Sequence, residues 1–227
     1  MVSRYFVGLT GASGHAYALT LVRALLECDQ QVDVSITDAG VKVIRHELGL
    51  DVGPGGVRLR DALAERLGPV SADKLRAFHA SAVEAPPSSG TALTGGVVLC
   101  PCSMGSLARV AAGFSSNLVE RAADVALKER RPLVLVVREA PLSQIHLENM
   151  LRMARMGAVV LPASPGFYHR PASLQDLVDH VVGKVLDTLR VTHSLGARWA
   201  GLPARPAEDE GTRAPPPPDP LSAGDQP

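Results

Sequence analysis

The chain has 227 residues, enough for one sizeable α/β core, and its 23 Lys and Arg balance its 23 Asp and Glu. A formal net charge of zero gives no indication of nucleic acid or an anionic membrane surface as a partner. Three cysteines without regular spacing argue against a disulfide framework and favour a reducing, cytoplasmic location. No basic segment precedes a long apolar run, so we expect neither a signal peptide nor a transmembrane helix.

In chain order, apolar runs of strand length alternate with helical patterns. Several of the expected strands consist almost entirely of Val, Leu and Ile, as parallel strands covered on both faces do. This alternation predicts a doubly wound α/β fold (Rossmann-like or flavodoxin-like), in which three layers (α/β/α) enclose a mostly parallel sheet. Strands are expected at 4–10, 31–37, 74–79, 96–100, 133–137 and 158–161, and helices at 16–28, 38–48, 117–129, 143–155 and 173–189.

Two regions interrupt this alternation. Residues 84–96 are rich in Pro, Ser and Gly and are expected to form a long loop, which beside a strand end is often functional. Residues 202–227 contain four consecutive prolines and almost no large apolar side chains. We therefore expect one domain over 1–201, followed by a Pro-rich disordered tail over 202–227.

Polar or glycine residues follow four of the expected strands at their carboxyl ends. The first strand runs into Gly11-Ala12-Ser13-Gly14, a glycine turn before a helix, which is the geometry that offers backbone N–H groups to a phosphate. Alone, this turn is a weak signal, because glycine suits any tight turn. Ligands of doubly wound sheets bind outside the carboxyl ends of the strands, so the four ends together predict one ligand site. The other three ends are Thr37-Asp38, 101–106 and Arg138-Glu139.

No metal site is expected from this sequence. Cys100-Pro101-Cys102 offers two thiols, but no second Cys/His pair with ligand spacing completes a set.

Five segments resemble the UbiX-type flavin prenyltransferases. The similarity extends over roughly residues 4–190, together with the glycine turn, and is most specific from residue 97 onward. The segments are LCPCSMGS at 99–106, ERAADVALKE at 120–129, REAPLS at 138–143, IHLENML at 145–151 and PGFY at 165–168.

The resemblance implies a specific reaction. Members of this family bind FMN noncovalently and attach a dimethylallyl group from dimethylallyl monophosphate to N5 and C6 of the reduced flavin. The prenylated FMN then serves a UbiD-type decarboxylase. The family needs no metal for this transfer, and it assembles as homododecamers with active sites between subunits.

The resemblance also assigns roles to residues of this chain. It implies that the flavin lies on Gly11, Ala12, Ser13, Thr37, Ser103, Met104, Gly105, Ser106 and Arg138. It assigns Glu139 to proton transfer, with Glu47 assisting, and gives Ser13 a catalytic role as a donor to the leaving phosphate. Without a metal, side-chain cations and donors must stabilise the leaving phosphate. The matched candidates are Arg121, Lys128, Tyr168 and Lys184, the last of which stands where the family often has Arg.

Each candidate also has an ordinary structural explanation. Arg121 would usually belong to an ion-paired, solvated helix face, and Lys128 would interact with a helix C-terminus. Tyr168 could simply anchor a loop. His146 looks catalytic in its context, but helix capping or a subunit contact explains it better, so we leave it out of the site.

One departure from the family leaves alternative functions open. The better-known relatives carry a Trp beside the allyl group, and Val83 stands in its place here, without a π surface to face a developing cation. The alternatives are a flavin-dependent cysteine decarboxylase of the same superfamily and a non-catalytic FMN carrier. The decarboxylases use a P-x-M-N-x-x-M-W type segment, and Pro101-Cys102-Ser103-Met104 lacks its Asn.

Overall fold

The computed structural model describes residues 2–68, 71, 73–92, 94–196 and 201. Its compact unit runs from Met1 to Ala197. The tail expected over 202–227 lies outside the described residues. Within the described part of the chain, no helix is both long and apolar enough to cross a membrane.

A six-stranded sheet forms the middle layer, and all its neighbouring strands are parallel. The strand order β3-β2-β1-β4-β5-β6 is the doubly wound Rossmann order, which confirms the predicted fold class. The order reverses between β1 and β4, which places the expected ligand crevice there. The strands are β1 (Arg4–Leu9), β2 (Gln31–Ile36), β3 (Leu75–His79), β4 (Thr94–Cys102), β5 (Leu133–Val137) and β6 (Val159–Pro162).

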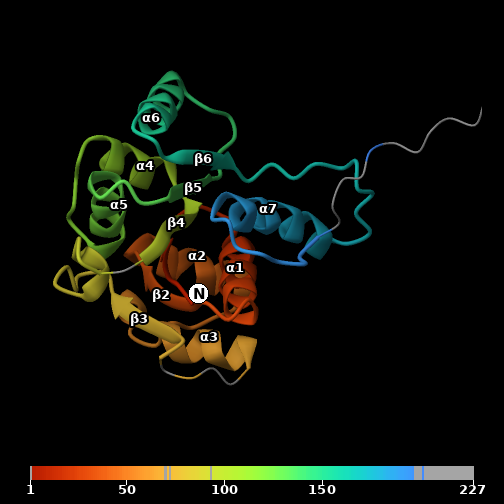
Figure 1. Ribbon diagram of the computed structural model, residues 1–227, viewed down its shortest axis with the longest axis horizontal. Helices are drawn as coiled ribbons and strands as arrows, with labels where there is room; N and C mark the ends of the chain where they lie inside the picture. Colours follow the sequence, from red (N-terminus) through yellow and green to blue (C-terminus); the bar gives the residue numbers. More distant parts are fainter. Residues whose placement is uncertain (1, 69–70, 72, 93, 197–200, 202–227) are drawn as a thin grey trace, which may run out of the picture. The chain divides into compact units, whose positions relative to one another are not determined.

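The helices cover both faces of this sheet (Figure 1). Helices α1 (His15–Glu27) and α7 (Leu174–Thr188) pack against each other over one face. Helices α4 (Met104–Ala111), α5 (Leu118–Lys128) and α6 (Gln144–Arg155) lie on the other. The remaining helices are α2 (Asp38–Leu48) and α3 (Leu59–Leu67), with short 3₁₀ turns η1 (Pro54–Gly56) and η2 (Pro86–Ser88).

Strand alternation divides the interior into two cores. Along β1, Tyr5, Val7 and Leu9 join the core under α1 and α7, whereas Phe6 joins the core under α4 and α5. The inner strands are buried on both sides, which explains why β5 consists only of Val and Leu.

Cys100 and Cys102 enter different cores, because the register between β4 and β5 shifts between Leu99 and Cys102. The two thiols therefore lie on opposite faces of the sheet and cannot chelate one ion together. Burial raises the pKa of both thiols, that of Cys102 to about 12, which makes them poor nucleophiles at neutral pH. Among the described residues, no group of three His, Cys, Asp or Glu side chains is placed to hold a metal ion.

Candidate functional site

The loop between β1 and α1 is shaped by its glycines. Gly14 has a φ of 111°, a conformation that L side chains rarely adopt, and a Cβ on Gly11 would lie 2.6 Å from the Cβ of Ala39. The backbone N–H groups of Gly11, Ala12 and Ser13 donate to no acceptor in the described part of the chain. The loop therefore presents three adjacent donors, as an anion-binding loop does.

Glu47, in the last turn of α2, occupies the N-terminus of α1. Its carboxylate accepts hydrogen bonds from the backbone N–H groups of Gly14, at 3.0 Å, and His15, at 2.9 Å. Burial raises the pKa of Glu47, but hydrogen bonds from Ser13, His15 and Gly14, with the field of His15, outweigh burial and hold the pKa below its usual range. The first amides of α1 thus bind a carboxylate of the protein. This arrangement shifts the expected phosphate position onto the loop donors that precede Gly14.

Thr10 connects the loops that follow β1 and β4, where the strand order of the sheet reverses. Its fully buried hydroxyl donates to the carbonyl of Pro101, at 2.7 Å, and accepts from the backbone N–H of Ser103, at 2.8 Å. The carboxyl ends of β1 and β4 are therefore held in a fixed relation. His15 adds a further connection, because its buried Nε2 lies 3.1 Å from the carbonyl oxygen of Thr10.

The turn into α4 offers a second set of donors beside the first. Ser103 caps the helix by accepting from the N–H of Ser106, at 3.2 Å. The N–H groups of Met104 and Gly105 have no acceptor in the described chain, and a Cβ on Gly105 would meet nothing within 4 Å. Open space in front of helix amides suits a ligand with acceptor atoms.

Two further strand ends complete this edge of the sheet. Thr37 follows β2 and caps α2 by accepting from the N–H of Gly40, at 3.2 Å. Arg138 follows β5, and its backbone N–H lies 3.4 Å from the carbonyl oxygen of Cys102. The side chains of Arg138 and Glu139 are exposed at this edge. All the residues expected to contact the flavin, together with Glu47 and Glu139, thus belong to the carboxyl edge.

The expected phosphate ligands of α5 are separated along that helix. Its start is held at the carboxyl end of β3, because the N–H of Leu118 donates to the carbonyl of Ala80 at 2.7 Å. Arg121, in the second turn, lies 3.1 Å from Asp124, which is the ordinary ion pair of a helix face. Lys128 lies at the other end of the helix, beside Gly90. Gly90 belongs to the segment that leads into the amino end of β4. Lys128 also pairs with Glu129. Because it lies at the opposite end of α5 from Arg121, it is separated from the other expected phosphate ligands within one chain.

Tyr168 and Lys184 form a third location. Tyr168 lies in the segment between β6 and α7, which leaves the sheet edge and returns along α7 (Figure 1). Tyr168 is 58% exposed, and its ring meets the ring of His180 edge-on, with centroids 5.8 Å apart. Lys184 follows His180 by one turn of α7 and is exposed. A single chain therefore presents the expected phosphate ligands in three places.

His146 has the capping role inferred from the sequence. Its Nδ1 accepts from the N–H of Ser143, and the hydroxyl of Ser143 accepts from the N–H of His146, which completes a capping box at the start of α6. A second capping box, formed by Ser173 and Asp176, stands at the start of α7.

Sequence reasoning missed several residues that matter at this edge. Thr10 and His15 flank the glycine turn, but no spacing rule singles out a hydroxyl or an imidazole there. Glu120, in the first turn of α5, is buried and accepts from Arg109 at 2.5 Å and from the N–H of Ser116 at 2.9 Å. Its role is to hold the turn between α4 and α5.

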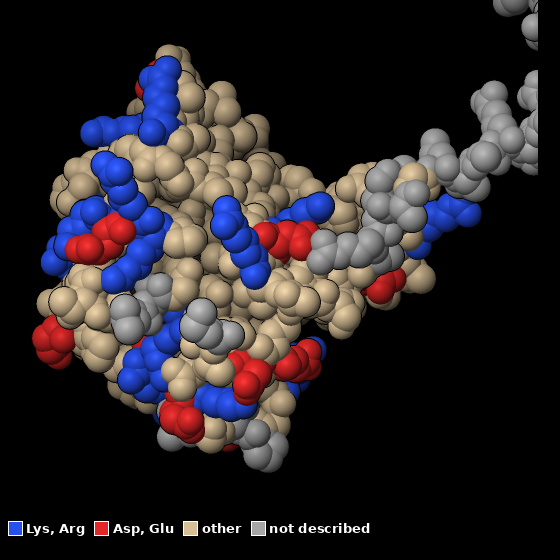
Figure 2. All heavy atoms as spheres, viewed as in Figure 1, with Lys and Arg blue, Asp and Glu red and all other residues tan. Residues whose placement is uncertain are grey.

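The charges on the visible face give no single-sign patch. Figure 2 shows Lys and Arg beside Asp and Glu over this face, with uncharged surface between them. This distribution agrees with the zero net charge of the chain.

Comparison with known proteins gives one consistent result. A family model described as Flavoprotein matches residues 2–194. Flavin prenyltransferase UbiX of Pseudomonas aeruginosa is 46% identical over 196 residues, which cover 86% of this chain and 93% of the relative.

Two solved structures are similar over nearly the whole fold. AnUbiX (PadA1), in complex with FMN and dimethylallyl pyrophosphate, has a TM-score of 0.78 and 36% identity, and covers 89% of this chain and 100% of its own. A dodecameric FMN-dependent UbiX-like decarboxylase from Escherichia coli O157:H7 has a TM-score of 0.77 and 37% identity, and covers 87% and 100%. The chain therefore belongs to the Flavoprotein family and, within it, to the UbiX flavin prenyltransferases.

Proposed function

We propose that this protein joins the dimethylallyl group of dimethylallyl monophosphate to N5 and C6 of reduced FMN. Prenylated FMN is the product, for delivery to a UbiD-type decarboxylase. The observation that carries the proposal is the carboxyl edge of the sheet, where the loop donors, Glu47 and Glu139 come together in a chain that is 46% identical to a UbiX flavin prenyltransferase.

The donor set at this edge fits FMN. Five backbone N–H groups, in the loop at 11–13 and at the start of α4 (104–105), have no acceptor among the described residues, which suits the acceptor oxygens of a phosphate and the carbonyls of a flavin ring. The Arg138 guanidinium, exposed beside them, supplies a cation for the reduced flavin. The reduced flavin itself provides the nucleophilic positions N5 and C6.

Side chains of the protein handle the charge and the protons of the transfer. Breaking the C–O bond of the donor leaves negative charge on the phosphate and positive charge on the allyl group. Arg121, Lys128, Tyr168 and Lys184 stabilise the phosphate, with no metal in the site. Glu139 transfers a proton, as an acid toward the phosphate or a base toward the flavin. Glu47, held by Ser13 and two backbone amides, assists from the other side of the loop.

The separation of the phosphate ligands within one chain favours an oligomer, and we infer a homododecamer in the cytoplasm. Lys128 and Tyr168 would reach the carboxyl edge of a neighbouring copy. Exposed apolar side chains on and near α6 give such copies a surface to bury. The exposed apolar residues of this region are Leu142, Ile145, Leu147, Leu151, Met156 and Val159.

One assay separates the candidate functions. The purified protein, loaded with FMN and reduced anaerobically, is mixed with dimethylallyl monophosphate, and the flavin is analysed by mass spectrometry. A flavin heavier by one C₅ unit supports the prenyltransferase. FMN bound at about one per chain but never modified would indicate a carrier, and loss of CO₂ from a cysteine-terminated peptide would indicate a decarboxylase. A protein without affinity for FMN, measured by quenching of flavin fluorescence, would contradict all three.

A further inference from the structure

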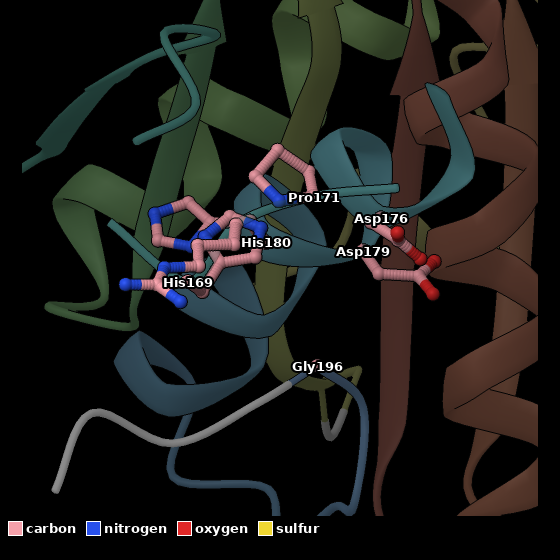
Figure 3. A pocket seen from close by; sticks show the side chains of 7 residues that line it. His169, Pro171, Asp176, Asp179, His180 and Gly196 are labelled. Carbon is pink, nitrogen blue, oxygen red and sulfur yellow. The ribbon is translucent and has the colours of Figure 1, made fainter. Parts of the chain in front are cut away.

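Three rings cluster between the segment after β6 and the middle of α7. The imidazoles of His169 and His180 are stacked, with centroids 4.9 Å apart and planes inclined by 4°. Tyr168 meets both rings edge-on, at 6.2 Å from His169 and 5.8 Å from His180. Figure 3 shows the two imidazoles lying against each other at the cavity, with Pro171 nearby. Tyr168, an expected phosphate ligand, is therefore in contact with two histidines that the proposed mechanism does not use.

The imidazole of His169 lacks hydrogen-bond partners that its burial requires. Both of its nitrogens are buried, and neither has a partner in the described chain. An unsatisfied buried polar atom is costly, and native proteins rarely keep one without a ligand, a water or a second subunit to pair it. The cavity beside it has a volume of about 190 Å³, room for a small group of atoms.

On the side of His180 that faces the stacked rings, the neighbouring charged groups are mostly positive. Burial lowers the pKa of His180, and the neighbouring His169 and Lys184 lower it further, so the imidazole is neutral at pH 7 when no anion is present. Arg170 lines the same cavity. Two acidic residues also line it, but Figure 3 shows Asp176 and Asp179 pointing away from the stacked rings. Asp176 is engaged by the N–H groups of Ala172 and Ser173, and Asp179 by the amide of Gln175.

We propose that His180, stacked on His169, is a further ligand of the phosphate monoester that Tyr168 and Lys184 bind, and that His180 takes up a proton when this dianion arrives. The identity of the monoester as the prenyl donor and the phosphate-binding roles of Tyr168 and Lys184 rest on the proposed function; the added role of His180 is argued from the ring cluster.

A lysine at position 184 explains why a further donor from His180 would help to bind the phosphate. Lysine offers a point charge, whereas the arginine of many relatives would offer two parallel N–H donors to one phosphate. His180 precedes Lys184 by four residues, so the two side chains are neighbours on one face of α7. A protonated His180 adds the directional N–H donor that Lys184 alone does not supply.

The test measures proton uptake together with affinity. FMN-loaded, full-length protein is titrated calorimetrically at pH 7 with inorganic phosphate and with dimethylallyl monophosphate, in two buffers with different heats of ionisation. The wild type should take up a fraction of a proton beyond what the ligand itself exchanges. His180→Phe keeps the ring stack but loses the donor, and should bind both ligands roughly 10-fold more weakly, because a charge-assisted hydrogen bond is lost, and without the extra proton.

Two further variants separate a ligand role from a structural one. His180→Gln keeps a neutral donor, so it should bind with intermediate affinity and lose the extra proton. His46→Phe changes an exposed histidine of α2 outside this cluster and should match the wild type. Unchanged affinity and proton uptake in both His180 variants would overturn the proposal, as would wild-type binding without extra proton uptake.

The two ligands also distinguish this inference from the proposed function. Inorganic phosphate should compete with dimethylallyl monophosphate, and failure to compete would overturn the assignment of the monoester to this cluster. Phosphate binding with His180-dependent proton uptake, in a protein that never prenylates FMN, would support the anion site and contradict the proposed function.

Discussion

Glu139 is the second residue after the end of β5. Its side chain is exposed, and in the described chain its carboxylate accepts a single hydrogen bond, from the N–H of Ala140. A carboxylate held this loosely is available to a substrate. We expect Glu139→Gln to retain FMN while slowing prenylation by roughly 100-fold or more, the scale of general acid–base catalysis. Stopped-flow formation of the prenylated flavin checks the rate, and fluorescence quenching checks the FMN affinity. Turnover at the wild-type rate would remove Glu139 from the catalytic residues.

Val83 is 43% exposed in the turn that follows β3, where its N–H donates to the carbonyl of Ser81. A tryptophan there would present a π surface to the allyl cation, worth about 0.5–2 kcal/mol, or roughly 2- to 30-fold in rate. We therefore expect Val83→Trp to accelerate the reaction with dimethylallyl monophosphate and to disfavour geranyl monophosphate, because it narrows the pocket. Steady-state kinetics with both donors checks this expectation. If neither the rate nor the chain-length preference changes, Val83 does not line the donor pocket.

Folding lowers the pKa of the Glu47 carboxylate, so this side chain makes the stability of the protein depend on pH. A depressed pKa means that the stabilisation is complete above the unfolded value, near 4.3, and is lost as pH falls through the folded pKa. We expect Glu47→Gln to lower the free energy of unfolding by about 0.5–1 kcal/mol at pH 7, the low end for helix caps because the side chain is exposed. The difference should shrink as the pH falls from 7 to 3. Denaturant unfolding of both proteins at pH 7 and pH 3 measures it, and an equal difference at both would contradict the linkage.

At the residue scale, the sequence indicated which side chains belong to the candidate site and where they stand in the chain. It did not indicate which residues they contact. Gly11 and Gly14 were predictable because tight turns have few residue choices. The attachment of Glu47 to the amides of Gly14 and His15 was not, because it joins residues more than 30 positions apart. The same holds for the stack of His169 on His180, which depends on how the segment after β6 returns to α7.

At the scale of elements, all six strands were predicted near their observed bounds, since apolar runs of Val, Leu and Ile leave little ambiguity. Helices α3 and α4 were missed. In α4, Ser103 and Gly105 look like loop residues although Ser103 is the helix cap, and in α3 only Leu59, Ala62 and Leu63 are buried. The strand β4 is longer than expected, because Gly95 and Pro101 resemble strand breakers.

The strands β1, β2 and β3 are joined by one buried acid in addition to their ladders. Asp33 is 2% exposed and accepts from Arg4 at 2.8 Å and from two nitrogens of Arg76 at 2.8 and 2.7 Å. We expect Asp33→Asn to cost about 3 kcal/mol of unfolding free energy, the low end for breaking a buried ion pair, because both arginines can still reach water. Urea unfolding measures the loss, and Asp61→Asn, in an exposed pair with Arg60, serves as the control with a change below about 0.5 kcal/mol. A loss no larger than in this control would show that the ladder hydrogen bonds alone hold this edge.

At the scale of the whole molecule, topology explains why the loops proposed to hold the flavin could be grouped from the sequence. Parallel strands bring their carboxyl ends to one edge, so residues that follow different strands meet there without any pairwise signal. The proposed phosphate ligands lie on α5, on α7 and in the segment before α7, outside that rule. In the proposed oligomer, their grouping depends on contacts between copies, which no periodicity within one chain encodes.

The position of Lys128, at the opposite end of the sheet from Glu139, has a genetic consequence. If each reaction centre draws these two residues from different copies, Lys128→Ala and Glu139→Gln damage different halves of it. Neither variant alone should turn over well, yet unfolding and refolding an equal mixture should restore about a quarter of wild-type activity, because random assembly pairs two intact halves at that frequency. Activity that stays at the level of the weaker parent would place both residues in one copy's site. Two recessive defects in this gene would then complement each other only when both products are made in the same cell.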